Sequence, residues 1–188
     1  MSRKPIVLFI VGPPGAGKTT AVRRLLGEFH TLNQRPKWTL ASGRSICAVG
    51  HYTGAVHDGG DTVPYSGARE AIRYWADNLA ADYRYTLLDG ARMATRPTLD
   101  WLQGCHVQAD IRLAHVVADQ AQLDARCLAR GTGQNVSWRK GARTRAWNFT
   151  QLVKARELPV YEVDANQDQA AVVAGLMLAL GMPLDRQV

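Results

Sequence analysis

The chain has 188 residues, of which 46% are hydrophobic and 21% are charged, and its 23 Lys and Arg against 16 Asp and Glu give a net charge of +7. This is an ordinary composition for a soluble globular protein. The length fits one domain that can bury a hydrophobic core without disulfides or bound metal to stabilise it. Cys47, Cys105 and Cys127 form no C-x-x-C pair and no Cys/His cluster, which argues against a disulfide framework or a zinc site and favours a reducing cytoplasm.

The first apolar run, Ile6–Val11, predicts a strand that is buried on both faces of a sheet. It is too short to span a membrane, and it leads into a glycine-rich turn rather than a small-residue cleavage site. No other stretch is long and apolar enough for a membrane span. We therefore expect a protein without a membrane segment.

A phosphate-binding loop follows this strand. Gly12–Thr19 reads GPPGAGKT and matches G-x-x-x-x-G-K-[ST] at every fixed position, between an apolar strand and an amphipathic helix. Such a loop directs its backbone N–H groups at an anion, with Lys18 on the β- and γ-phosphates and the Thr19 hydroxyl on Mg²⁺. The predicted ATP-binding residues are Gly12, Pro13, Pro14, Gly15, Ala16, Gly17, Lys18, Thr19 and Thr20.

Strands and helices alternate along the rest of the chain. Further strands are predicted at Ile46–Val49, Tyr85–Leu88, Ile111–Val117 and Leu158–Val163. Helices are predicted at Lys18–Phe29, Ala68–Tyr83, Leu99–Leu102, Gln120–Arg130 and Gln167–Leu180. Irregular segments are predicted at Thr31–Ser45, Gly50–Gly67 and Gly131–Thr144. This alternation predicts one three-layer α/β domain of the P-loop type over residues 1–188, in which five parallel strands, numbered along the chain, take the order 2-3-1-4-5 between helices on both faces.

Carboxylates are placed where a kinase would use them. Asp89 ends the third predicted strand, at the sheet edge where ligands gather, and can bind Mg²⁺ together with Thr19. Asp58 and Asp61 lie in a glycine-rich loop after the second strand, and either can accept the proton of a substrate hydroxyl. Asp61 is the preferred base, and both residues can instead simply form a turn.

Cations are concentrated in one part of the chain, a basic segment over residues 126–156. Arg126 and Arg130 lie one helical turn apart and are candidate catalytic arginines that neutralise the transferring phosphoryl group. Arg130 to Arg156 contains seven cations and no acid, so that the rest of the chain is balanced. The candidate substrate- or DNA-binding residues are Arg139, Lys140, Arg143, Arg145, Trp138 and Trp147.

With GPPGAGKTT as its specific part, the whole chain resembles the adenylate-kinase-like branch of P-loop kinases, which phosphorylate nucleotides, polynucleotides and sugars. The resemblance implies that the helix with Arg126 and Arg130 is an arginine-bearing lid. It also implies that the loop Val163–Asp168, which contains Asn166, packs the adenine ring of ATP.

A narrower resemblance rests on GHYTGAVHDGGDT, LLDGAR and WRKGARTRAWNF. These stretches are similar to phage kinases that phosphorylate 5-hydroxymethyluracil in DNA, a step toward hypermodified thymine. That family has the order Gly-Gly-Thr-Asp, whereas this chain has Gly59, Gly60, Asp61 and Thr62, so Asp61 does not align with the family's aspartate and the resemblance does not by itself give Asp61 a catalytic role.

Three functions follow from these patterns. The first is Mg²⁺- and ATP-dependent phosphorylation of a hydroxymethyl pyrimidine in DNA, in the cytoplasm of a host if the chain comes from a phage. The second is a kinase for a free nucleoside, nucleotide or other small alcohol. The third is a nucleic-acid-binding ATPase or switch, because a P-loop alone does not establish phosphoryl transfer to an acceptor.

Overall fold

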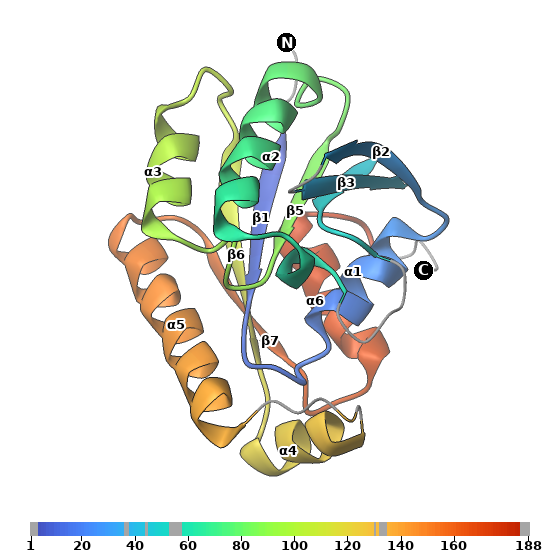
Figure 1. The fold of residues 1–188 in the computed structure, drawn as a ribbon, viewed down its shortest axis with the longest axis vertical. Helices are drawn as coiled ribbons and strands as arrows, with labels where there is room; N and C mark the ends of the chain where they lie inside the picture. Colours follow the sequence, from blue (N-terminus) through green and yellow to red (C-terminus); the bar gives the residue numbers. More distant parts are fainter. Residues whose placement is uncertain are drawn as a thin grey trace.

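A seven-stranded mixed sheet forms the centre of the protein in a computed structural model, which describes residues 4–35, 38–43, 45–52, 58–129, 131 and 135–184 (Figure 1). From one edge to the other the strands are β2 (His30–Arg35), β3 (Trp38–Gly43), β4 (Ile46–Val49), β5 (Tyr85–Asp89), β1 (Ile6–Val11), β6 (Asp110–Val117) and β7 (Val160–Asp164). The five strands from β4 to β7 in this order pair in parallel, whereas β2, β3 and β4 pair antiparallel.

The prediction of five strands in a wholly parallel sheet is therefore wrong, and the order of the complete sheet differs accordingly. The missed strands, β2 and β3, fall in the segment expected to be irregular. Strand β3 is buried, but part of its buried surface is polar: the Thr39 hydroxyl lies 2.7 Å from His51 Nε2, and the Ser42 hydroxyl donates to the Tyr83 hydroxyl at 3.0 Å. Because these hydroxyls have partners, the strand does not need a continuous apolar run.

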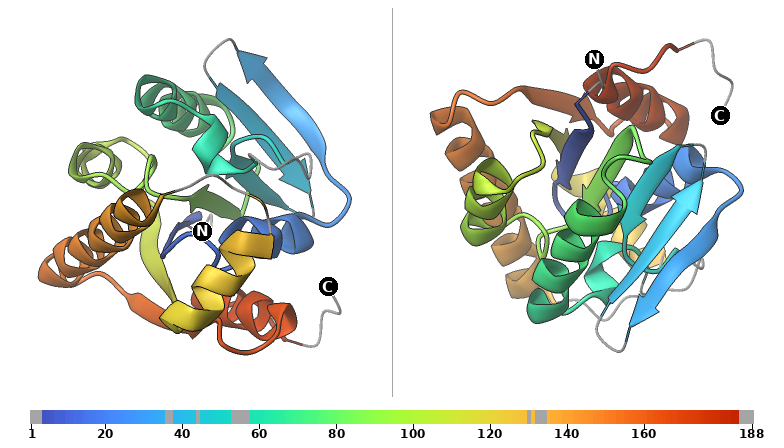
Figure 2. Two further views of the ribbon diagram at one scale, coloured as in Figure 1. Left: turned by 60° about the horizontal axis from the view of Figure 1, so that its bottom comes forward. Right: turned by 90° about the horizontal axis from the view of Figure 1, so that it is seen from above.

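Helices cover both faces of the sheet (Figure 2). One face carries α1 (Lys18–Leu26) and α6 (Gln169–Leu180), and the other carries α2 (Tyr65–Asn78), α3 (Arg96–Gly104) and α5 (Val136–Ala155). Strand β1 is buried on both sides, since Leu8 packs with the first group of helices and Phe9 with the second. The three-layer α/β architecture is thus as predicted, while α4 (Gln120–Ala129) lies beyond the carboxyl end of the parallel strands (Figure 1).

Helix α5 replaces most of the irregular segment expected up to Thr144. The Asn135 side chain caps its N-terminus by accepting a hydrogen bond from the backbone N–H of Trp138 at 2.7 Å. Its buried face consists of small residues and Phe149, whose ring meets that of Phe9 edge-on at a centroid distance of 5.0 Å. Small residues let a strongly basic helix pack closely on the sheet.

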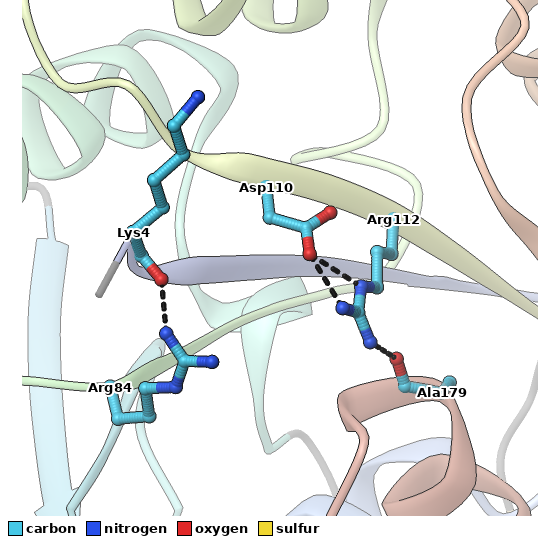
Figure 3. A network of polar contacts seen from close by, with 5 residues as sticks. All are labelled: Lys4, Arg84, Asp110, Arg112 and Ala179. Carbon is cyan, nitrogen blue, oxygen red and sulfur yellow. Dashed lines mark hydrogen bonds and ion pairs between the residues drawn. The ribbon is translucent and has the colours of Figure 1, made fainter.

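At the end of the sheet far from the glycine-rich loop Gly12–Thr19, two arginines form the hydrogen bonds shown in Figure 3. The Arg112 guanidinium donates to Asp110 Oδ2 at 3.1 and 2.5 Å and to the carbonyl of Ala179 at 2.8 Å. That carbonyl belongs to the last turn of α6, where backbone acceptors lack helical partners. Arg84 likewise donates to the carbonyl of Lys4. These contacts attach α6 and the start of β1 to the sheet, far from the phosphate loop.

Two further observations concern the cysteines and the lengths of the helices. Cys47, Cys105 and Cys127 form no disulfide bond, and burial raises the pKa of the Cys47 thiol to about 12, so this thiol has a structural role. Within the described ranges, no helix combines the length and the apolar character that crossing a bilayer requires.

Candidate active site

The phosphate loop lies between the end of β1 and the start of α1. Gly17 has φ of 79°, a left-handed conformation that glycine adopts without strain, and α1 begins at the next residue. A side chain at Gly17 would also strike Gln169, whose amide donates to the Gly17 carbonyl at 3.1 Å. Lys18 Nζ donates to the carbonyls of Gly12 and Pro13, both at 3.0 Å. The loop is thus held open at a helix N-terminus, where backbone N–H groups attract an anion.

Asp89 lies directly beside this loop and is only 2% exposed. Its Oδ2 accepts a hydrogen bond from the Thr19 hydroxyl at 2.7 Å, whereas Oδ1 is buried and has no partner among the described residues. Burial raises the pKa of Asp89 to about 6, although the Lys18 ammonium and the Thr19 hydrogen bond both oppose the rise. A buried carboxylate oxygen without a partner, next to a threonine hydroxyl, fits a cation that needs oxygen ligands.

The glycine pair Gly59 and Gly60 packs the loop before α2 against Asp89. A Cβ atom at Gly60 would lie 1.8 Å from the Asp89 carbonyl oxygen, so only glycine fits there. Thr62 fixes the turn, since its hydroxyl donates to the Gly59 carbonyl at 2.7 Å and accepts from the His51 N–H at 3.1 Å. This close approach positions Asp61, the first residue after the pair, opposite the phosphate loop in the 3₁₀ helix η1 (Gly60–Thr62).

The two candidate bases have different surroundings. Asp61 is exposed and lines the cleft in front of the phosphate loop. The Asp58 side chain is only 8% exposed, and its Oδ2 lies 3.9 Å from Nε of Arg23 on α1. Of the two, therefore, the structure brings Asp61 to the cleft.

The cleft itself has a volume of about 370 Å³ and is formed by the phosphate loop, the start of α2, the end of β5 and one face of α5. Besides Lys18, Thr19 and Asp61, its walls include two residues that the sequence did not single out, Tyr65 and Arg92. Arg92 is held by a hydrogen bond to the carbonyl of Val63 at 3.1 Å. Arg92 could have been identified as a site residue from its position three residues after Asp89, the aspartate at the end of the strand. Nothing in the sequence around Tyr65 indicates a site.

The residues of the basic segment that lie on helix α5 have different surroundings. Trp138 and Arg145 line the cleft, as their spacing of seven residues on one helix face allows. Arg139 forms an ion pair with Asp124 of α4, and Arg143 donates to the side-chain oxygen of Gln120 at 3.1 Å.

The remaining two predicted residues of this segment lie elsewhere. Lys140 is exposed outside the cleft, and Trp147 is 55% exposed beside His115, with ring centroids 6.3 Å apart. The cations of the basic segment therefore have different surroundings, and an acid from another helix neutralises one of them.

Helix α4 holds the loop that follows β7. Arg126 donates to the carbonyls of Ala165 and Gln167 at 2.9 and 3.3 Å, and the Asn166 side chain accepts from the Asp119 N–H at 2.7 Å. Arg126 therefore contacts the loop predicted to pack adenine, and it is not among the residues that line the cleft. Arg130 lies outside the described residues. The catalytic roles of both arginines and the ATP contact of Asn166 stay predictions.

No protein-family model matches the chain, and no curated protein matches its sequence. A similar solved structure is deoxyadenosine kinase from M. mycoides with bound dATP, at a TM-score of 0.53 and 14% identity over 94% of this chain and 100% of that one. This chain and that kinase share a fold over nearly their whole lengths. The same enzyme with its products dCMP and a flexible dCDP matches at a TM-score of 0.49 and 14% identity, and with dCTP at 0.47 and 13%, each over 94% of this chain and 99% of that one.

Proposed function

We propose that this protein is an ATP-dependent kinase that transfers the γ-phosphate to a hydroxyl group of a nucleoside or nucleotide. The observation that carries the proposal is the cleft of about 370 Å³, which has the phosphate loop on one wall and Asp61 on the other. That volume is within the range of small-molecule sites. The proposal is also supported by the fold, which is shared with a deoxyadenosine kinase that binds dATP.

The donor side is assigned to the phosphate loop. On binding ATP, Lys18 would exchange the carbonyls of Gly12 and Pro13 for the β- and γ-phosphate oxygens. Thr19 and the unpartnered Oδ1 of Asp89 would hold Mg²⁺ directly or through water. When bound, this ion would neutralise charge on the β- and γ-phosphates of ATP.

The acceptor side is assigned to the wall that contains Asp61. The acceptor hydroxyl oxygen attacks the γ-phosphorus, and a new O–P bond forms while the bond from phosphorus to the β,γ-bridging oxygen breaks. ADP leaves with that electron pair, and the hydroxyl proton passes to the Asp61 carboxylate. Asp61 is preferred over Asp58 because only Asp61 is exposed in the cleft.

A second candidate acceptor is the 5-hydroxymethyl group of 5-hydroxymethyluracil in DNA. One observation favours it: Trp147, Lys140 and Arg143 are exposed on α5 outside the cleft, where they can contact a nucleic acid strand. Against it, the Arg139–Asp124 ion pair removes one cation from this surface.

Transfer of label from [γ-³²P]ATP tests the proposal. The acceptors are the deoxynucleosides and their 5′-monophosphates, including the 5-hydroxymethyluracil forms, together with duplex and single-stranded DNA with and without that base. Labelled small molecules support the main proposal, label confined to modified DNA supports the second candidate, and release of free phosphate alone overturns both in favour of an ATPase. Lys18→Ala should abolish every transfer, because it removes the charge that follows the γ-phosphate.

Asp61→Asn tests the assigned base. It should lower kcat by roughly 100-fold or more with little change in ATP binding, because general-base catalysis contributes factors of about 10²–10⁴. Asp58→Asn is the matched control, since this side chain faces Arg23 rather than the cleft, and it should retain most of the turnover. Equal losses in the two variants would contradict the assignment.

A further inference from the structure

Arg145 differs from the neighbouring arginines because its guanidinium makes no hydrogen bond or ion pair with any residue that the structure describes. Arg139 is paired with Asp124, Arg143 with Gln120, Arg126 with the loop after β7, and Arg92 with the Val63 carbonyl. Arg145 alone among these five combines a position in the cleft with a guanidinium that has all its donors free.

Gly141 makes room for this arrangement. Helical side chains lean toward the N-terminus, and Arg145 Nη1 lies one turn back over Gly141, where a Cβ atom would be 3.3 Å away. A glycine in the interior of a helix costs about 1 kcal/mol relative to alanine. The glycine thus leaves room for the Arg145 guanidinium to approach α5, while Arg145 remains exposed at the cleft.

These side chains face the acceptor half of the cleft. Helix α5 covers the same face of the sheet as α2, which begins with Tyr65 next to η1 and Asp61 (Figure 2). The phosphate loop leads into α1 on the opposite face, where α6 follows the loop held by Arg126. An ATP molecule with its phosphates on Lys18 and its base toward that loop would leave the α5 side to the acceptor.

We infer that the acceptor already carries a phosphate group, apart from the hydroxyl that is phosphorylated, and that Arg145 binds this phosphate while Trp138 stacks on the base. The inference rests on the proposed kinase function and names its substrate class: a nucleotide, either free or within an oligonucleotide. A free guanidinium recognises phosphate oxygens by charge-assisted hydrogen bonds, and a tryptophan that is 43% exposed offers an aromatic face. A nucleoside would leave Arg145 without a partner.

The test compares nucleosides with their own 5′-monophosphates. Binding and kcat/KM are measured for the deoxynucleosides, the monophosphates and short single-stranded oligonucleotides, each with and without 5-hydroxymethyluracil. Binding is measured with the donor site saturated by a non-hydrolysable ATP analogue, so that only the acceptor site is probed. We expect the phosphorylated form to be favoured by roughly 10- to 100-fold, the range for one hydrogen bond to a charged group.

Arg145→Gln should reduce this preference at least tenfold, through KM more than through kcat, because the contact with the acceptor's phosphate is made equally in the ground state and in the transition state. Lys154→Gln, an exposed residue of the same helix outside the cleft, is the matched control and should keep the preference. If nucleosides and nucleotides are used equally, or if Arg145→Gln lowers both alike, the inference is overturned while the kinase function stands. If neither nucleosides nor nucleotides are bound or phosphorylated, both the kinase function and this inference fail. A preference for oligonucleotides over free nucleotides would show that the phosphate bound by Arg145 belongs to a nucleic acid strand.

Discussion

Replacing Asp89 by asparagine should stabilise the folded protein while abolishing its activity. The folded state raises the pKa of this carboxyl from 3.8 to about 6, with burial as the largest cause. A proton therefore binds the folded protein more tightly than the unfolded chain. The contribution of Asp89 to stability is fully present below pH 3.8 and is lost as the pH rises through about 6.

The magnitude follows from the same values. Each pKa unit corresponds to about 1.36 kcal/mol, so the rise from 3.8 to about 6 corresponds to roughly 3 kcal/mol in favour of the protonated folded state. Asparagine is neutral at every pH, and its side-chain oxygen can still accept the hydrogen bond from Thr19. Asp89→Asn should therefore exceed the wild type in unfolding free energy by up to about 3 kcal/mol at pH 8, and this gain should vanish toward pH 4.

Urea unfolding without Mg²⁺, followed by tryptophan fluorescence between pH 4 and pH 8, measures this difference, and equal m-values would show that both proteins unfold alike. Adding Mg²⁺ should stabilise the wild type at pH 8, because the ion binds only the ionised folded form, and should leave the asparagine variant unchanged. A stability difference that does not vary with pH, or that falls as pH rises, would refute the reasoning about Asp89.

Two further substitutions test the loop and the helix that form the cleft. Gly60→Ala should lose both phosphoryl transfer and thermal stability, because the added carbon would lie 1.8 Å from the Asp89 carbonyl oxygen. The control is Gly104→Ala, whose added carbon meets nothing within 4 Å. Thermal melting and phosphoryl transfer are measured for both variants. Asn135→Ala should lower the unfolding free energy by about 1 kcal/mol in urea titrations, since it removes the cap of α5, and an unchanged midpoint would contradict that role.

The parts of the molecule that the sequence predicted are those whose signal is local. The phosphate loop is encoded within nine residues, and the continuous apolar run of β1 identifies a strand buried on both faces. Strand β3 carried no such signal, because hydrogen bonds from Thr39 and Ser42 to distant residues are what permit its burial. Burial satisfied by long-range polar contacts cannot be read from periodicity.

The active site shows the same division. Asp89 was identifiable at the end of a strand, but its pairing with Thr19 joins residues 70 positions apart. The sequence could not show that Arg139 of the basic segment is neutralised, because its partner Asp124 belongs to a preceding helix. Helix α5 itself had a usable signal in Asn135, a preferred N-cap residue, but the arginines and the glycine that follow obscured its narrow apolar face.

The central position of β1 has a consequence for how the protein is made. This strand is synthesised first, yet its neighbours in the sheet are β5 and β6, whose pairings reach residues 85–89 and 110–115. Strands β2, β3 and β4 pair with one another over short stretches of chain, so they can form before β5 and β6 have emerged from the ribosome. The phosphate loop follows β1 directly, and it has no rigid support until β6 has emerged. A nascent chain should consequently acquire affinity for nucleotide only once β6 has emerged, long after its own phosphate-binding residues have left the ribosome.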